Sequence, residues 1–426
     1  MRLNSDDVNI LSSDSFPLSL YIHIPFCETK CPYCDFNTYS HIEPMIPSYL
    51  EALRTEIEIW GNMLRSPLLG TVFFGGGTPS YVPVKGLDSI LKTVASSFNI
   101  TEGVEITLES NPGDLNEATL GDYLGAGVNR LSIGVQSFDD QMLTLLGRRH
   151  TSDDAVQAFE AALKAGFTNV SIDLMYGLPD QTMDIWFETL KTAQQLDPHH
   201  ISLYALTIEE DTPMHNWVAS GRMTDPDPDL SADMYLLAEE RMDSLGYCHY
   251  EISNWSKPGF KSEHNLAYWK NLSYLGVGPG AHSYISDCRF RNIRSPREYI
   301  TRLGVESREN KGFLYKFSES VSDNLDREDN ELQRVSFFES VPVVEKVELV
   351  DNNLEMAETM MMGLRLIEGI NLDDFVYRFG VSLDNVYGGT ISQLVSDGLL
   401  EIKCGCVRLT GRGRLLGNEV FSSFFQ

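Results

Sequence analysis

The first half of the chain alternates short apolar runs with longer amphipathic stretches. The apolar runs have the length and the β-branched and aromatic composition of buried strands: Ser19–Ile24, Thr71–Phe74, Val104–Leu108, Arg130–Val135, Asn169–Met175 and Ile201–Ala205. Between them, apolar positions recur at helical spacing in Ser48–Leu64, Leu87–Phe98, Asn116–Ala126, Ser152–Ala165 and Thr182–Gln195. Serial βα repeats predict an α/β fold with a parallel sheet. Six strands predict a partial (β/α)6 barrel rather than a closed one of eight strands.

The pattern changes beyond about residue 213. Asp229–Leu245 predicts another amphipathic helix, whereas the glycine-rich and aromatic segment His264–Ser283 lacks periodicity and predicts a loop. The acid-rich segment Ser318–Glu358 predicts a solvated surface insertion. The last part predicts a winged-helix-like α+β domain, from three helical stretches and a hairpin: Leu354–Ile367, Leu372–Phe379, Leu383–Ser396, Gly398–Ile402 and Val407–Thr410.

These changes predict the domain organisation. We expect an N-terminal extension at 1–17, a (β/α)6 core at 18–212 and an extension of that core at 213–305. An acidic linker at 306–353 and the C-terminal domain at 354–426 complete the chain.

Composition and charge narrow the function classes. The chain has 426 residues and a net charge of −28, and such a field repels phosphate backbones, which argues against nucleic-acid binding. No window has the roughly 18 consecutive apolar residues of a membrane span. The polar N-terminus resembles neither a secretory signal nor a transit peptide. We therefore expect the cytoplasm, or an organelle matrix or stroma if a leader peptide is missing from this sequence.

Three cysteines directly follow the first predicted strand. Cys27, Cys31 and Cys34 have the spacing C-x3-C-x2-C, and thiolates on one loop can hold three irons of a [4Fe–4S] cluster. Position 36 is Phe, so no nearby ligand completes the set, and one iron stays open to a substrate or cofactor. A zinc site or plain buried thiols are the alternatives, which the spacing disfavours. Two further cysteines, Cys404 and Cys406, flank a glycine in the predicted hairpin and are interpreted as incidental thiols.

Polar or glycine-rich segments follow the other predicted strands. Ligand groups of parallel α/β folds collect at the carboxyl ends of strands, and there the chain has Gly75–Ser80, Glu109, Gln136, Arg148, Asp173 and Ala205. Singly, each is typical of a turn or helix cap. Together they suit a zwitterionic molecule that carries adenosine, because carboxylates can bind ribose hydroxyls and Arg can bind a carboxylate.

Two histidines lie among aromatic residues in the segment predicted as a loop. His264 and His282 are typical of hydrogen-bonded structural histidines, but a neutral imidazole beside an apolar pocket also suits the iron of a porphyrin.

Several spaced motifs together resemble one known family. The cysteine loop, Gly75–Ser80, Gln136, Arg148, Ile172–Pro179 and His264–Ser283 resemble the coproporphyrinogen III oxidase-like branch of the radical S-adenosylmethionine (SAM) superfamily. The resemblance implies a [4Fe–4S] cluster on Cys27, Cys31 and Cys34, bound SAM, an electron donor and a capacity to cleave SAM. It also implies a set of residues around the cofactor: Tyr21, Tyr33, Gly76, Gly77, Thr78, Glu109, Gln136, Arg148, Asp173 and Ala205.

Within this branch, two motifs separate heme handling from porphyrin biosynthesis. Coproporphyrinogen dehydrogenases carry a fourth cysteine two residues past the third, where this chain has Phe36. The segment His264–Trp269 instead resembles the H-N-x-x-Y-W motif of the HemW family of heme chaperones. That resemblance implies heme as a cofactor, a role for His264 in holding it and transfer to apo-hemoproteins. An oxygen-independent coproporphyrinogen III dehydrogenase, or a radical SAM enzyme with another substrate, are the alternatives.

Overall fold

The computed structural model describes residues 17–304 and 331–425. They belong to two compact units. The first contains the described residues through Ser132, with Glu160–Thr168 and Ser273–Leu349, and the second contains Ile133–Phe159, Asn169–Leu272 and the chain from Val350 onward. Residues 1–16 and 305–330, which include most of the predicted extension and much of the predicted acidic linker, lie outside the described ranges.

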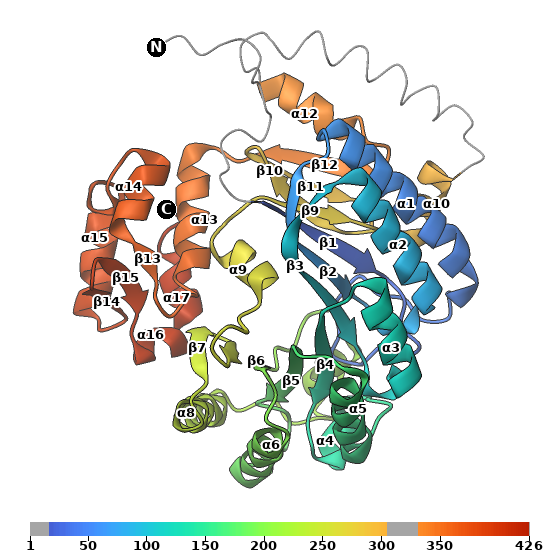
Figure 1. Ribbon diagram of the computed structural model, residues 1–426. Helices are drawn as coiled ribbons and strands as arrows, with labels where there is room; N and C mark the ends of the chain where they lie inside the picture. The colour runs from blue at the N-terminus through green and yellow to red at the C-terminus, as the bar shows by residue number, and fades with distance from the viewer. Residues whose placement is uncertain (1–16, 305–330, 426) are drawn as a thin grey trace. The chain divides into compact units, whose positions relative to one another are not determined.

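The first half of the chain has the predicted alternation of strands and helices (Figure 1). Its elements are β1 (Leu18–Ile24), α1 (Ile46–Met63), β2 (Leu68–Gly76), α2 (Val84–Ser97), β3 (Asn99–Ser110), α3 (Glu117–Ala126), β4 (Arg130–Gln136), α4 (Asp140–Leu145), α5 (Ser152–Ala165), β5 (Val170–Tyr176), α6 (Met183–Leu196) and β6 (His200–Ala205). All six predicted strands are confirmed, and the short helix α4 is an addition. Among the helices of the described ranges, none has the length and apolar character that crossing a membrane requires.

The sheet of the first unit is mixed. Its strand order is β12-β11-β10-β9-β1-β2-β3, in which β1 runs parallel to β2 and β9, and β2 runs parallel to β3. The other pairs are antiparallel and use the short strands β9 (Tyr274–Val277), β10 (His282–Ile285), β11 (Cys288–Asn292) and β12 (Val344–Leu349). Figure 1 shows α1, α2 and α10 (Pro296–Leu303) gathered along one side of this sheet.

The segment predicted as a solvated insertion is partly core. Its second half forms α12 (Glu331–Glu339) and the edge strand β12. Phe338 of α12 is 1% exposed and stacks on Phe290 of β11, with ring centroids 4.7 Å apart. The prediction of a solvated segment is therefore wrong for 331–349, because a few aromatic and β-branched residues among many acids suffice to pack one face of a helix and a strand.

The segment His264–Ser283 is not the predicted loop. It contains the helix α9 (Glu263–Trp269) and the strands β9 and β10. These elements are too short to show a period in the sequence. Gly276 in β9 marks a close approach of backbone, since a Cβ there would lie 2.1 Å from the carbonyl oxygen of His282.

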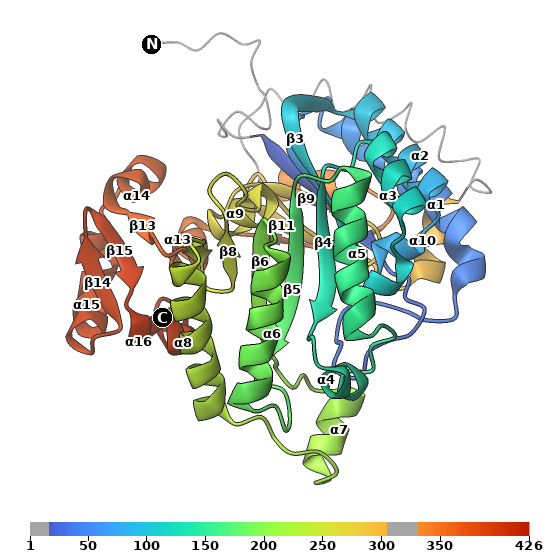
Figure 2. The ribbon, with the colours of Figure 1, turned by 60° about the horizontal axis from the view of Figure 1, so that its bottom comes forward.

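The second unit contains the remaining core strands. β5 pairs in parallel with β6, which pairs antiparallel with β8 (Asn254–Ser256), and β8 pairs antiparallel with β7 (Cys248–Glu251). Figure 2 shows α6 beside α8 (Pro228–Ser244). The two helices are joined by the fully buried Trp186, whose Nε1 donates to the carbonyl of Met234 at 2.8 Å.

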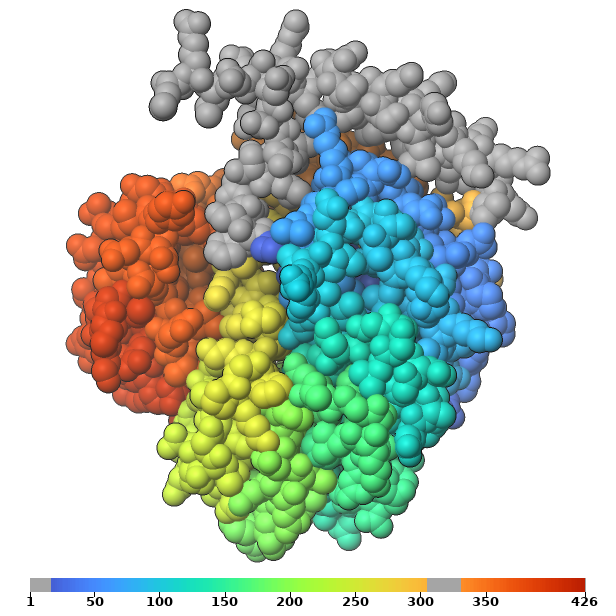
Figure 3. Space-filling model, in the orientation of Figure 1, coloured from blue at the N-terminus to red at the C-terminus, as the bar shows by residue number. Residues whose placement is uncertain are grey.

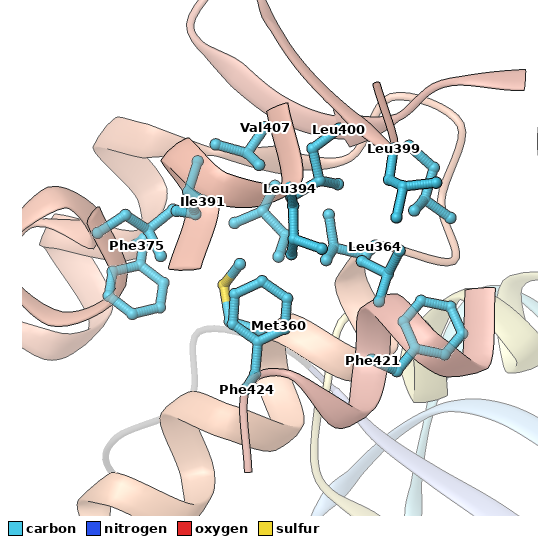
Figure 4. Packing of buried hydrophobic residues seen from close by; sticks show 14 of the residues in the cluster. Met360, Leu364, Phe375, Ile391, Leu394, Leu399, Leu400, Val407, Phe421 and Phe424 are labelled. Carbon is cyan, nitrogen blue, oxygen red and sulfur yellow. The ribbon is translucent and has the colours of Figure 1, made fainter. Parts of the chain in front are cut away.

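The end of the chain forms the predicted winged-helix-like module. Its elements are α13 (Asn352–Gly363), β13 (Ile370–Asn371), α14 (Leu372–Phe379), α15 (Leu383–Ser396), β14 (Leu400–Lys403), β15 (Cys406–Leu409), α16 (Gly411–Leu415) and α17 (Gly417–Ser422). The strands have the order β13-β15-β14. Met360, Leu364, Leu394 and Val407 pack in its own apolar core (Figure 4). The hairpin turns at Cys404 and Gly405, both at positive φ, as a two-residue loop requires.

Candidate functional site

The cysteine loop begins where β1 ends and is closed by backbone hydrogen bonds. The amide of Cys27 donates to the carbonyl of Tyr39 (3.0 Å), and the amide of Tyr39 donates to the carbonyl of Pro25 (2.8 Å). Within the loop, Lys30 Nζ donates to the carbonyl of Phe36 at 3.0 Å. The Phe36 side chain is 64% exposed, so the residue that stands in place of a fourth cysteine lies at the surface.

The three thiols of the loop are partly shielded from water. Cys27 is buried, and Cys31 and Cys34 are half-buried. Burial raises the pKa of the Cys27 and Cys34 thiols, although hydrogen bonds to both thiols and the charge of Lys30 near Cys34 oppose the shift. Thr78 Oγ1 lies 3.6 Å from Cys27 Sγ and donates to it.

The donor set of this loop fits the predicted cluster. In a [4Fe–4S] cluster each cysteine binds a different iron, so three neighbouring thiols on one loop can hold three irons. Across residues 17–304 and 331–425, no three His, Cys, Asp or Glu side chains are arranged around the position of one metal ion.

The glycine run at the end of β2, Gly75–Gly77, packs against the start of the cysteine loop. The amides of Gly77 and Thr78 donate to the carbonyls of Ile24 (2.7 Å) and Phe26 (2.8 Å). A Cβ at Gly77 would lie 2.6 Å from the carbonyl oxygen of Phe26, and Gly76 has a φ of 110°. Both positions therefore need glycine, and the run fixes where the loop leaves the sheet.

Tyr21 and Glu109 lie close together on the first unit's sheet. A Cβ on Gly75 would lie 3.0 Å from Tyr21 Cε2 and 3.1 Å from Glu109 Oε2. Burial, and then the charge of Glu109, raise the pKa of Tyr21 well above its usual value. The Tyr21 hydroxyl is 3.1 Å from Nδ1 of His23, whose Nε2 is 3.0 Å from the carbonyl of Asn37 in the cysteine loop.

Gln136 and Arg148 lie near each other in the second unit. Gln136 ends β4 with a φ of 68°, a left-handed conformation that is uncommon for residues other than glycine and that often marks functional positions. Arg148 Nη2 donates to the carbonyl of Gly134 at 2.6 Å. His150 Nε2 is 3.0 Å from the carbonyl of Val135, so this turn folds back onto the end of β4.

Asp173 and Ala205 lie on adjacent parallel strands of the second unit. Asp173 of β5 is in register with Ser202 of β6, and Tyr176 is in register with Ala205. Ala205 is the last residue of β6, at the carboxyl edge where the sequence predicts cofactor contacts.

His264 lies in the first turn of α9 and is 1% exposed. Its Nε2 is 3.1 Å from the hydroxyl of Tyr268, one turn later, and the two rings meet edge to face. The motif therefore forms a helix in which its histidine and tyrosine contact each other. His282, the second predicted histidine, lies on β10 of the first unit.

The predicted residues are divided between the two units. The first unit contains Tyr21, Cys27, Cys31, Tyr33, Cys34, Gly76, Gly77, Thr78 and Glu109. In the second unit are Gln136, Arg148, Asp173, Ala205 and His264. That residues of both units bind one cofactor stays a prediction.

Glu56 is a buried polar residue that was not predicted from the sequence. This carboxylate on α1 is fully buried and accepts from the amide of Gly278 (2.8 Å), Nδ2 of Asn292 (2.6 Å) and the hydroxyl of Tyr299 (2.5 Å). Burial raises its pKa to about 7, although these donors oppose the shift. The sequence does carry a signal, since Glu56 falls on the apolar face of α1 three residues after Leu53 and four before Trp60.

Glu56 supports the turn that receives the cysteine loop. Asn37 Nδ2 donates to the carbonyls of Pro279 and Arg294, both at 2.9 Å. A Cβ on Gly280 would lie 2.6 Å from that nitrogen. The buried carboxylate of Glu56 and the side-chain amide of Asn37 therefore bind neighbouring residues of the same turn, Gly278 and Pro279.

Comparison with known proteins identifies the family. The model of the radical SAM superfamily matches residues 21–193, and that of the HemN C-terminal domain matches residues 350–416. The heme chaperone HemW of Bacillus subtilis is 36% identical over 407 residues, which cover 95% of this chain and 98% of the relative. The chain belongs to the HemW family of radical SAM proteins. Membership in this superfamily implies a [4Fe–4S] cluster and SAM.

The chain is also similar to proteins of other organisms. HemW of Escherichia coli is 32% identical over 411 residues, which cover 96% of this chain and 98% of the relative. A Danio rerio protein named radical S-adenosyl methionine domain-containing protein 1, mitochondrial, is 38% identical over 277 residues, which cover 64% of this chain and 62% of the relative.

One solved structure supports the fold. Coproporphyrinogen III oxidase (HemN) from Escherichia coli aligns with a TM-score of 0.76 at 22% identity and covers 96% of this chain and 90% of that one. At this identity, the likeness supports the partial-barrel fold with its C-terminal domain.

Proposed function

We propose that this chain binds heme and passes it to apo-hemoproteins. The observation that supports this most is its 36% identity to a heme chaperone over 95% of the chain. Phe36, in place of a fourth cysteine, agrees with the proposal. The likeness to HemN at 22% identity concerns the fold, so it does not favour coproporphyrinogen dehydrogenation.

The cysteine loop supplies the ligands for the cluster in this proposal. Cys27, Cys31 and Cys34 hold three irons and leave the fourth open for SAM. Tyr21, Tyr33, the glycine run, Glu109, Gln136, Arg148, Asp173 and Ala205 are the residues assigned to SAM. When bound, the cluster supplies one-electron chemistry toward SAM, and an electron donor is then required. Free cysteines and this chemistry suit a reducing compartment such as the cytoplasm.

His264 is the proposed heme ligand, and its burial sets a condition on binding. A heme iron can be coordinated by a neutral imidazole nitrogen. Since Nε2 of His264 contacts the Tyr268 hydroxyl and the residue is 1% exposed, coordination through Nε2 requires this contact to break and the surroundings of α9 to open.

A heme titration tests the proposal. The reconstituted protein should develop a Soret band on addition of heme, and His264→Ala should weaken or shift it. His215→Ala, a change on α7 (Pro213–Ala219) of the same unit, is the matched control. No Soret shift with wild type would contradict heme binding, and an unchanged titration in His264→Ala would remove His264 from its role.

An anaerobic assay separates the alternative activity. The protein is incubated with SAM, a reductant and coproporphyrinogen III, and the porphyrinogen products are measured. We expect no protoporphyrinogen IX. Its formation would establish dehydrogenase activity and contradict a function limited to heme transfer.

A further inference from the structure

The carboxyl end of α9 is held by the C-terminal module. Nη1 of Arg378, on α14, donates to the carbonyl of Lys270 at 3.1 Å, and Nη2 donates to the carbonyl of Asn271 at 2.8 Å. These carbonyls belong to the C-cap residue and the residue after it, at the helix end where backbone carbonyls lack partners within the helix and a cation is favourable. One arginine therefore caps the carboxyl end of the helix that carries His264.

The same guanidinium is fixed from its other side. Nε and Nη2 of Arg378 donate to Oε1 of Glu355 on α13, at 3.0 and 2.6 Å. The planar fork of Arg can serve a carboxylate and backbone carbonyls together, which the single ammonium of Lys cannot do in the same geometry. Arg378 thus ties three helices, α9, α13 and α14, to one another.

Two further contacts from the module reach the end of α9. Nδ2 of Asn271, a buried residue with a φ of 50°, donates to Oγ1 of Thr359 at 3.1 Å. The guanidinium of Arg365 lies over the Trp269 ring, 4.4 Å from its centroid. Arg365 also lies 3.8 Å from the buried carboxylate of Glu251 on β7.

We propose that this set, the α9 anchor (Glu355, Thr359, Arg365 and Arg378), positions the His264–Tyr268 pair for heme. The inference rests on the proposed heme function. α13 packs beside α9, and Figure 3 shows the yellow segment that contains α9 against the orange C-terminal module. Trp269, the last residue of the H-N-x-x-Y-W motif, then contributes to this positioning, because the guanidinium of Arg365 packs on its ring.

The position of the α9 anchor explains how it can act on His264. α9 has seven residues, and so short a helix is not stable alone. Its amino end is capped by Ser262, which accepts from the amide of Asn265. With the carboxyl end fixed by the anchor, the opening that heme binding requires can occur at the amino end, while Tyr268 keeps its place.

Arginine variants of the module test this positioning role. Arg378→Gln removes the charge and the fork, and Arg378→Lys keeps the charge alone. Arg408→Gln is the matched control, because the two arginines are alike in exposure and pairing. The Arg408 side chain is 27% exposed and pairs with Glu401 at 2.6 Å, and the Arg378 side chain is 29% exposed and pairs with Glu355 at 2.6 Å. The bond of Arg408 lies within the module's own hairpin.

The first measurement is amide hydrogen exchange in the heme-free protein. In Arg378→Gln we expect exchange in residues 264–272 to accelerate by about tenfold or more, with exchange in α15 unchanged as the sign of a folded module. Arg378→Lys should give a smaller acceleration, and Arg408→Gln none. Unchanged exchange of α9 in both Arg378 variants would overturn the inference.

The second measurement is heme affinity by Soret titration. If α9 in Arg378→Gln spends less time in the arrangement that binds heme, the apparent Kd for heme should rise by about threefold to tenfold. Iron content should stay that of wild type. Faster α9 exchange with unchanged or tighter heme binding would overturn the positioning role.

The two measurements also separate this inference from the proposed function. A wild-type protein without His264-dependent heme binding would refute the heme proposal, and with it the positioning role of the anchor. The exchange data would then still decide whether the module holds α9. Heme binding in wild type with no response to Arg378 would refute the anchor alone.

Discussion

The cysteine loop and α9 carry the two halves of the proposed function, and they are held in different ways. The loop is closed mainly by bonds between backbone groups, such as Cys27 to Tyr39, with the Asn37 side chain tying it to the turn at Pro279, and two of its thiols are half-buried. His264 on α9 is enclosed, 1% exposed, and α9 is fixed by side chains such as Arg378.

This difference has a physical consequence. A loop fixed by its backbone presents ligands without rearrangement, so cluster assembly depends on the strand ends beneath it. A histidine enclosed by side chains becomes available only when contacts break, so its affinity includes the free energy of opening. We therefore expect changes under the loop to affect iron, and changes around α9 to affect heme.

The largest expected effect is loss of iron from the cysteine loop. In the triple variant Cys27→Ala, Cys31→Ala, Cys34→Ala, iron after anaerobic reconstitution should fall from about four per chain to near zero. Heme titration should persist, because α9 lies outside the loop. Iron and sulfide analysis with the absorption spectrum provides the measurement.

A second triple variant controls for the loss of thiols in general. Cys248→Ala, Cys404→Ala, Cys406→Ala removes cysteines that are exposed or half-buried elsewhere. It should keep its iron. Equal iron in the two triple variants would refute the assignment of the ligands.

Glu56 should have the next largest effect, on stability. Glu56→Ala removes the acceptor from four buried donors, including Trp60 Nε1, and should lower the free energy of unfolding by about 3 kcal/mol or more. The turn that receives Asn37 would loosen, so iron should be lost faster while α9 exchange stays unchanged. Glu58→Ala, at an exposed position of the same helix, should change little.

The raised pKa of Glu56 gives this prediction a pH dependence. Between the ordinary pKa of 4.5 and the folded value of about 7, the folded carboxyl keeps a proton that the unfolded one has lost. The free energy of unfolding contributed by Glu56 should therefore fall as pH rises through this window, by roughly 3 kcal/mol in total. Denaturant unfolding from about pH 5 to about pH 8 should show this fall in wild type relative to Glu56→Gln. If the difference in unfolding free energy between wild type and Glu56→Gln did not change with pH, the prediction would be wrong.

The sequence predicts the fold well where apolar runs are long and regular. The strands from Ser19 to Ala205 and the module after Leu354 are where expected, because burial of a whole strand or helix face leaves a period in the sequence. β9 and β10 were missed because each has four residues. α12 was missed because it lies in an acid-rich segment and Phe338 is the only buried residue among its nine.

The candidate site shows the same limit. The spacing of Cys27, Cys31 and Cys34 is visible because all three ligands lie on one loop. Arg378 and Lys270 are 108 residues apart in the sequence. No local sequence pattern therefore reveals that Arg378 caps the carboxyl end of α9. Contacts between side chains and distant backbone leave no local pattern, and they are what holds α9.

The smallest of these effects concerns the glycine run beneath the cysteine loop. In Gly77→Ala the new Cβ would lie 2.6 Å from the carbonyl oxygen of Phe26 and 2.9 Å from that of Ile24. Backbone cannot yield as a flexible side chain does, so the variant should lose about 1–3 kcal/mol of unfolding free energy and release iron faster on exposure to air. At Gly113 a Cβ would have no heavy atom within 4 Å, so Gly113→Ala is the matched control and should retain iron as wild type does. If Gly77→Ala kept its iron equally well, the loop would not depend on the glycine run, and the contrast with α9 would rest on the cysteines alone.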